Sequence, residues 1–338
     1  MTPRAPRTGH LRREPGSRDP LQKTVLVLRA LGLGDFLTAL PALRALGDAL
    51  PEHRRVLAMP AALTPLARLA GVADEVLDAR GLTRLLPLPT PPDLAVNFHG
   101  AGPVSHRILL ATRPRRLLAF AHPEVPETAG APTYREDEHA VHRWCRLLEA
   151  HGIAADPTRL DLLAAGARLP GAAPAAACGA TLIHPGAASA ARRWPAERFA
   201  AVARAERAAG RRVVVTGSAD ERPLAVSIAR AAGLDETVVY AGRTSLVDLA
   251  TLVAAAGRVV CGDTGVAHLA TALRTPSVVL FGPVSPARWG PPPERPWHRV
   301  LWTGRTGDPH GSTLDAGLSV IRVPDVLRAL EDLVEAAA

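Results

Sequence analysis

Short apolar runs alternate with helical patterns along this chain from about residue 23 onward, and several of these runs end in a glycine-containing turn. Strands that alternate with helices indicate parallel sheets with helices on both faces. Because hydrophobic residues make up 47% of the chain and aromatic residues only 4%, we expect aliphatic cores of Ala, Leu and Val. The strands are expected at 24–28, 54–59, 74–78, 94–98, 180–183, 213–216, 238–240, 259–261 and 277–281.

A low-complexity stretch of Ala, Gly and Pro divides this pattern into two similar halves. A chain of 338 residues is too long for one ordinary core, so two domains are expected. We predict a disordered basic tail (1–21), an N-terminal domain (22–165), a linker (166–179), a C-terminal domain (180–320) and a final helical segment (321–338). Ligands bind beyond the carboxyl ends of parallel strands, which predicts a site in the cleft between the two halves.

The net charge of +8 suits an anionic small substrate, an anionic membrane or a nucleic acid, and arginines scattered over a solvated surface explain it equally well. Aromatic residues are not interleaved with the basic ones, which argues against nucleic acid. Cys145, Cys178 and Cys261 are isolated, which indicates reduced thiols in a cytoplasm. No apolar run is long enough to span a bilayer, so any membrane contact is expected to be peripheral, at the inner face.

The first predicted strand ends in the turn Gly32-Leu33-Gly34-Asp35. The two glycines let the backbone approach a ligand closely, and Asp35 could act as a general base on an acceptor hydroxyl. Its alternative role is that of a helix N-cap. Leu37 stands where a dinucleotide-binding fingerprint needs its third glycine, which disfavours hydride transfer.

Two loops of the second half carry further polar residues. Small residues over 184–189, Ser189 among them, leave backbone amides open to an anion, and Arg192 follows with a guanidinium that matches phosphate oxygens. The alternative is a solvated arginine beside a packed tryptophan. In the loop 217–221, Glu221 could accept hydrogen bonds from a ribose, although helix capping explains this loop equally well.

The loop 262–268 is the fourth candidate, because Thr264 and Gly265 open a predicted helix whose amides can point at a diphosphate. His268 lies one turn further on the same face and could donate a hydrogen bond to a phosphate oxygen. A packing role for this histidine is the alternative.

The run Asp263-Thr264-Gly265-Val266-Ala267-His268-Leu269-Ala270 resembles the C-terminal signature of glycosyltransferase family 9. This is the family of the ADP-heptose:lipopolysaccharide heptosyltransferases. The resemblance continues through Thr275-Pro276, Phe281-Gly282-Pro283 and Trp289-Gly290-Pro291. Gly34-Asp35 with residues 40–43 resembles the first loop and helix of that family, and residues 192–195 resemble its Lys-x-Trp-Pro segment.

The resemblance implies a GT-B fold, in which two Rossmann-like doubly wound domains face a central cleft and the last helix crosses back to the N-terminal domain. It implies transfer with inversion, without an essential metal and without a cofactor, and with Asp35 as the base. Arg192 stands where the family usually has a phosphate-binding lysine, which keeps the charge and changes the geometry. Glu221 matches a position of the family that contacts the ribose of the donor. The positions that bind the donor diphosphate and nucleotide are matched by Asp263, Thr264, Gly265 and His268.

The partners implied are a nucleotide-sugar donor and a glycan or glycolipid acceptor of the cell envelope, with no nucleic acid. Acceptor contacts are expected in the N-terminal half, at Gly34, Asn97, His99 and Arg107. The acidic run 136–138 is interpreted as charge at a helix start, not as a metal site. A nucleotide-sugar epimerase or dehydrogenase, and a non-catalytic nucleotide-sugar binder, are the alternatives on similar domains.

Overall fold

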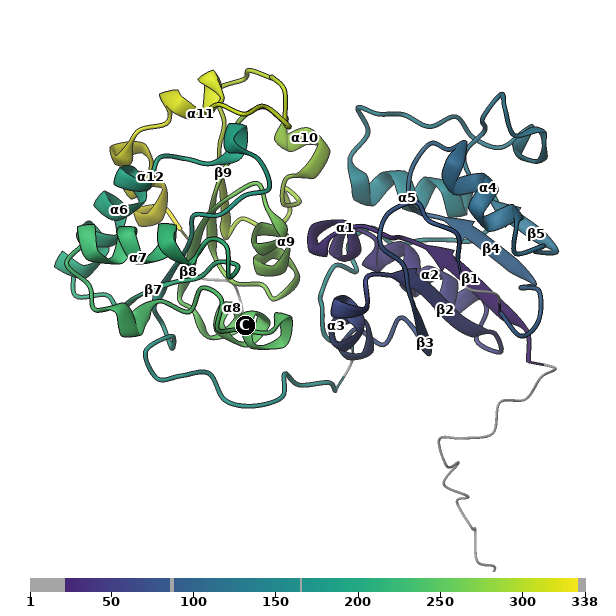
Figure 1. Ribbon diagram of the computed structural model, residues 1–338, viewed down its shortest axis with the longest axis horizontal. Helices are drawn as coiled ribbons and strands as arrows, with labels where there is room; N and C mark the ends of the chain where they lie inside the picture. Colours follow the sequence, from purple (N-terminus) through teal and green to yellow (C-terminus); the bar gives the residue numbers. More distant parts are fainter. Residues whose placement is uncertain (1–21, 86–87, 165, 334–338) are drawn as a thin grey trace, which may run out of the picture.

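The computed structural model describes residues 22–85, 88–164 and 166–333, which fold into two α/β lobes that lie side by side (Figure 1). Each lobe contains a five-stranded parallel sheet, as the alternating pattern predicts. The predicted tail 1–21 and the end of the last predicted helix lie outside the described residues.

The N-terminal lobe has the strand order β3-β2-β1-β4-β5. Its central strand β1 is buried along its whole length, which is typical of a parallel strand covered on both faces. The strands are β1 (Thr24–Leu28), β2 (Arg54–Met59), β3 (Glu75–Asp78), β4 (Leu94–Asn97) and β5 (Arg116–Leu118). The helices are α1 (Leu33–Thr38), α2 (Leu40–Ala49), the 3-10 turn Ala61–Leu63, α3 (Thr64–Leu69), α4 (Val104–Leu110), the 3-10 turn Pro126–Thr128 and α5 (Ala140–Glu149).

The C-terminal lobe repeats this architecture with the strand order β10-β9-β8-β6-β7. The strands are β6 (Thr181–His184), β7 (Val213–Val215), β8 (Arg258–Gly262), β9 (Ser277–Leu280) and β10 (His298–Leu301). The helices are the 3-10 turn Ala190–Arg192, α6 (Ala196–Ala208), α7 (Arg222–Ala231), the 3-10 turn Glu236–Val238, α8 (Leu246–Ala255), α9 (Gly265–Ala272), α10 (Pro286–Trp289), α11 (Ala316–Val320) and α12 (Val323–Glu331).

Two expectations about these elements are wrong. Residues 238–240 form no full strand, because a 3-10 turn ends at Val238 and only an isolated bridge joins Val239 to Val215. The last helix, over its described residues, does not cross back: α12 packs against α6, β9 and β10 of its own lobe, where Val326 and Leu330 enter the core. Its apolar face is therefore already buried within the C-terminal lobe.

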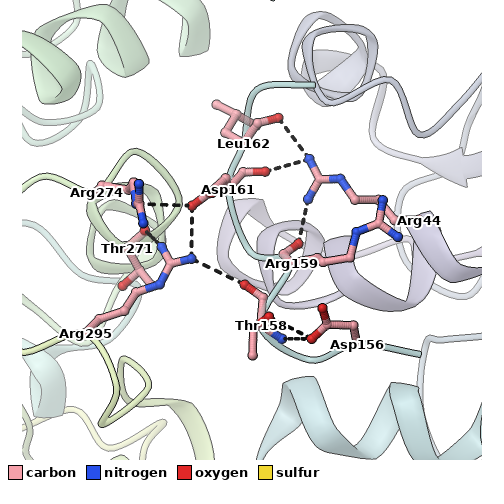
Figure 2. A network of polar contacts seen from close by, with 9 residues as sticks. All are labelled: Arg44, Asp156, Thr158, Arg159, Asp161, Leu162, Thr271, Arg274 and Arg295. Carbon is pink, nitrogen blue, oxygen red and sulfur yellow. Dashed lines mark hydrogen bonds and ion pairs between the residues drawn. The ribbon is translucent and has the colours of Figure 1, made fainter. Parts of the chain in front are cut away.

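The two lobes are in contact at several places, and two of these lie at α1 and at residues 156–162. At the first, α1 of the N-terminal lobe packs against α9 of the C-terminal lobe, and their apolar residues belong to one continuous core. At the second, residues 156–162 lie between arginines of both lobes (Figure 2). Arg44 of α2 donates to the carbonyl oxygens of Arg159 and Asp161, each at 2.6 Å. Arg295 of the other lobe donates to the Asp161 carboxylate at 2.9 Å.

No helix in the described part of the chain is both long and apolar enough to cross a membrane.

Candidate active site

A cleft of about 690 Å³ lies between the lobes, lined by loops that follow the carboxyl ends of strands in both sheets. The N-terminal lobe contributes the turn 32–35 after β1, together with Glu136. The C-terminal lobe contributes residues of 184–193 after β6, 218–221 after β7, 263–268 at the start of α9, and further residues of 284–289 and 309–310. The loops predicted to form the site therefore converge on one cavity.

Asp35 reaches this cleft from the first turn of α1, where Gly32, not Asp35, is the N-cap residue. Its side chain is 29% exposed, and Arg29 donates from Nη2 to its Oδ1 at 3.1 Å. Among the described residues no hydrogen bond reaches Oδ2. The capping role is therefore excluded, and one carboxylate oxygen is left for a ligand.

Arg192 lies on the opposite wall and is held by Asp263, which is only 8% exposed. Its Nη2 contacts both the main-chain oxygen and Oδ2 of Asp263, the latter at 3.1 Å. The Nε of Arg192 is buried and has no partner in the described part of the chain. Asp263 thus fixes the guanidinium at the cleft wall, and Nη1, which forms no hydrogen bond in the described part of the chain, is left as a donor for an anion.

Thr264 and Gly265, at the start of α9, line the cleft. Thr264 is the N-cap residue in extended backbone conformation, and its Oγ1 is buried without a hydrogen-bond partner among the described residues. Buried polar groups are normally paired, so an unpaired hydroxyl at a helix N-terminus indicates a place for an oxygen-rich ligand.

His268 follows one turn along α9 and also lines the cleft. Burial lowers the pKa of its imidazole, an effect that the nearby carboxylates of Asp263 and Asp35 oppose. The ring meets Trp289 of α10 edge to face, with 6.1 Å between ring centroids. At neutral pH the imidazole is therefore neutral and offers one N–H donor.

Glu221 borders the far end of the cleft, close to the loop after β6. Its Oε2 accepts a hydrogen bond from the Ser218 amide at 2.8 Å, and a Cβ atom at Gly186 would lie 2.1 Å from its Oε1. Only glycine fits at position 186 while this carboxylate stays in place. Beside it, burial lowers the pKa of His184 to about 4, and Glu221 partly opposes that shift.

Four predicted site residues are not among those that line the cleft. The Ser189 hydroxyl donates to the Pro309 carbonyl at 2.6 Å and so secures the loop that carries His310. Asn97 is fully buried, with its amide bonded to the Ser105 hydroxyl at 2.9 Å.

The other two follow β4. Arg107 forms an exposed ion pair with Glu124 at 2.8 Å. His99 is half-buried, and its pKa is lowered by burial and by the neighbouring charge of Arg29. Asp35 raises this pKa in turn, so His99 lies within electrostatic range of the Arg29–Asp35 pair.

Sequence reasoning missed several residues of the site. Arg29 is one, since an arginine that follows a strand resembles any solvated arginine. The interpretation of Glu136 as helix-start charge is wrong, because α5 begins at Ala140 with His139 as its N-cap. Glu136 lines the cleft instead and pairs with Arg288 of the other lobe at 3.4 Å.

In the part of the chain that the structure describes, no group of three or more His, Cys, Asp or Glu residues is placed to hold a metal ion.

The model of one protein family, described as glycosyltransferase family 9 (heptosyltransferase), matches residues 131–305, more than half of the chain. This chain belongs to glycosyltransferase family 9. A family 9 relative, lipooligosaccharide heptosyltransferase 2 of Haemophilus influenzae, is 37% identical over 105 residues, which is 30% of this chain and 30% of that protein. The aligned segment thus spans less than a third of this curated relative.

Solved structures extend the likeness to nearly the whole chain. An Escherichia coli ADP-heptose lipopolysaccharide heptosyltransferase II is 21% identical with a TM-score of 0.67, over 91% of this chain and 97% of that one. An E. coli heptosyltransferase solved with ADP is 18% identical with a TM-score of 0.69, again over 91% and 97%. The fold of this chain is therefore GT-B, with two parallel-sheet α/β lobes, as the resemblance of its motifs to family 9 implies.

Proposed function

We propose that this family 9 protein transfers a heptose from ADP-heptose to a hydroxyl of a lipopolysaccharide-type glycolipid, with inversion at the anomeric carbon and without a metal ion. The observation that carries this proposal is that one cleft presents a carboxylate, Asp35, from one lobe and the N-terminus of α9 from the other. Family membership and the ADP bound by one E. coli relative support the choice of donor.

The C-terminal lobe would bind the donor diphosphate. The amides at the start of α9, the Thr264 hydroxyl and the free N–H groups of Arg192 would all donate to phosphate oxygens. Donors that are fixed before the reaction stabilise the charge that develops on the leaving diphosphate, which is usually the largest catalytic contribution. His268 would add one more donor, and Glu221 would accept hydrogen bonds from the ribose hydroxyls.

The N-terminal lobe would activate the acceptor. Oδ2 of Asp35 would take the proton of the acceptor hydroxyl while that oxygen attacks the anomeric carbon, from the side opposite the diphosphate. The bond between the anomeric carbon and the diphosphate oxygen breaks, and its electron pair leaves with ADP. A glycolipid acceptor implies that the enzyme works peripherally at the inner face of the membrane.

The test is transfer from ADP-heptose to heptose-free lipopolysaccharide in buffer containing EDTA, with ADP affinity measured separately by calorimetry. Asp35→Asn should lower kcat about 10²- to 10⁴-fold and leave ADP affinity unchanged, because general-base catalysis contributes that much. Asp332→Asn, at the exposed end of α12, is the matched control and should turn over like the wild type. If Asp35→Asn turned over the substrates at the wild-type rate, Asp35 would not be the base. Consumption of ADP-heptose without an acceptor product would indicate an epimerase.

A further inference from the structure

Arg29 is among the most completely buried charged residues in the described part of the chain, with 1% of its surface exposed. It follows β1 directly and points to the first turn of α1. Its Nε donates to the main-chain oxygen of Asp35 at 2.9 Å, and its Nη2 donates to the carboxylate Oδ1 of the same residue at 3.1 Å. One guanidinium thus holds the backbone and the side chain of Asp35 together.

The remaining contacts of Arg29 fix the guanidinium itself. Its Nη1 donates to the Phe98 carbonyl at the end of β4, and its Nη2 lies 3.4 Å from the Thr38 hydroxyl. The Trp144 ring of α5 covers its face, with 4.7 Å between Cζ and the ring centroid. A guanidinium that contacts the end of β4 and two helices has little freedom to move, so the direction of its N–H bonds is determined by the fold.

Such burial is costly for a charge. Burial lowers the pKa of Arg29 to about 10, yet the group stays protonated at neutral pH. An apolar side chain of similar size would pack at this place without the desolvation cost of an ion. If Arg29 served only to join β1 to α1, its charge would be a disadvantage, so its orientation of the Asp35 carboxylate is the property that explains it.

We infer that Arg29 is a positioning residue for the proposed base: it binds Oδ1 and the main-chain oxygen of Asp35, so that Oδ2 alone faces the cleft. This inference deepens the proposed function and rests on it for its catalytic consequence. Arg29 does not line the cleft, so it acts through Asp35 and not on the substrate.

The first test is structural and independent of activity. Crystal structures of the wild type, Arg29→Met and Leu147→Ala are compared at one pH; Leu147 is fully buried in α5 and serves as a matched destabilising control. In Arg29→Met the Asp35 carboxylate should turn away from its wild-type position, whereas it should stay in place in Leu147→Ala. An unmoved Asp35 in Arg29→Met would overturn the inference. Should that variant not fold, Arg29→Lys replaces it, because a single ammonium cannot serve all these acceptors.

The second test separates positioning from stability through kinetics, at a temperature where all variants are folded. With ADP-heptose and heptose-free lipopolysaccharide, Arg29→Met should lower kcat about 10- to 100-fold while the Kd of ADP stays constant. Arg29→Lys should recover part of kcat, and Leu147→Ala should keep the wild-type value. Equal kcat values for Arg29→Met and Leu147→Ala would contradict positioning. If the wild type transfers no heptose, the proposed function fails, and the crystallographic comparison alone decides the role of Arg29.

Discussion

Gly34 of α1 lies directly against the imidazole ring of His268 in α9, so close that a Cβ atom at position 34 would be 2.6 Å from Cδ2 of that ring. Nearby, a Cβ atom on Gly265 would lie 3.0 Å from Cβ of Leu33. Two glycines therefore let the lobes touch at the edge of the cleft itself. This contact keeps the loop of Asp35 beside the N-terminus of α9.

Replacing Gly34 by alanine should force this contact apart. A Cβ contact at 2.6 Å cannot persist, and overpacking of this kind costs about 1–3 kcal/mol. We expect a lower Tm in thermal unfolding and weaker ADP binding, because His268 must shift. Gly100→Ala is the control, since no atom lies within 4 Å of its added methyl group. If both variants had the same Tm and the same affinity for ADP, the contact would not exist in solution.

Thr264→Val should separate ligand binding from stability. The threonine hydroxyl is buried and has no partner in the described residues, so its loss should leave Tm unchanged or slightly higher. A hydrogen bond to a charged group contributes about 1.5–3 kcal/mol, which corresponds to roughly 10- to 100-fold weaker ADP binding.

A matched hydroxyl for this comparison is that of Thr251, which donates to the Val247 carbonyl within α8, away from the cleft. Thr251→Val should therefore bind ADP like the wild type. Unchanged calorimetric affinity in Thr264→Val would mean that this hydroxyl does not contact the nucleotide.

The sequence allowed the fold and the main loops to be predicted because both depend on local patterns. Apolar runs such as 24–28 and 259–261 are buried on both faces, and each is followed by a glycine turn. Parallel strands place their carboxyl ends at one edge of a sheet, so the loops that carry Asp35 and Thr264 were expected to meet in the cleft.

What could not be predicted depends on distant partners. The short edge strand β5 begins with Arg116, and its single buried residue, Leu118, is too weak an apolar signal for a strand. Glu136 and Arg288 are 152 positions apart, and only the packing of the lobes brings them together. Asn97 was predicted to contact the acceptor because it is a polar residue at a strand end. Its side-chain amide instead donates a hydrogen bond to the Ser105 hydroxyl within the lobe.

The contact between residues 156–162 and the C-terminal lobe should contribute to stability through Asp161. Its carboxylate is the partner of Arg295, a residue only 9% exposed, at 2.9 Å. Asp161→Asn leaves that guanidinium without a counter-charge, and because the carboxylate is half exposed we expect a loss of about 1–2 kcal/mol in urea unfolding.

An exposed ion pair gives the comparison for this variant. Arg230 and Glu236 lie 2.5 Å apart with side chains 71% and 43% exposed, so Glu236→Gln should cost at most about 0.5 kcal/mol. Equal losses in the two variants would show that the Asp161–Arg295 pair adds nothing beyond an ordinary surface pair.

His298 should make the protein less stable in acid. Burial, with a smaller effect from Arg295, lowers its pKa to about 3, whereas the unfolded chain has the ordinary value of 6.5. Between these values the unfolded state binds one more proton than the folded state. The contribution of neutral His298 to the free energy of unfolding is fully present above pH 6.5. It falls with decreasing pH, by up to about 1.4 kcal/mol per pH unit. His184, whose pKa is lowered to about 4, acts in the same direction.

Substitution of His298 should therefore flatten the dependence of unfolding free energy on pH. His298→Asn keeps a polar group for the Ser277 hydroxyl, which lies 2.8 Å from Nδ1 of the histidine, and removes the titration. We expect the slope of unfolding free energy between pH 6.5 and 4.5 to decrease, as measured by urea unfolding at several pH values. His310→Asn, at an exposed position, should keep the wild-type slope. Parallel curves for His298→Asn and the wild type would show that protonation of His298 does not oppose folding in this range.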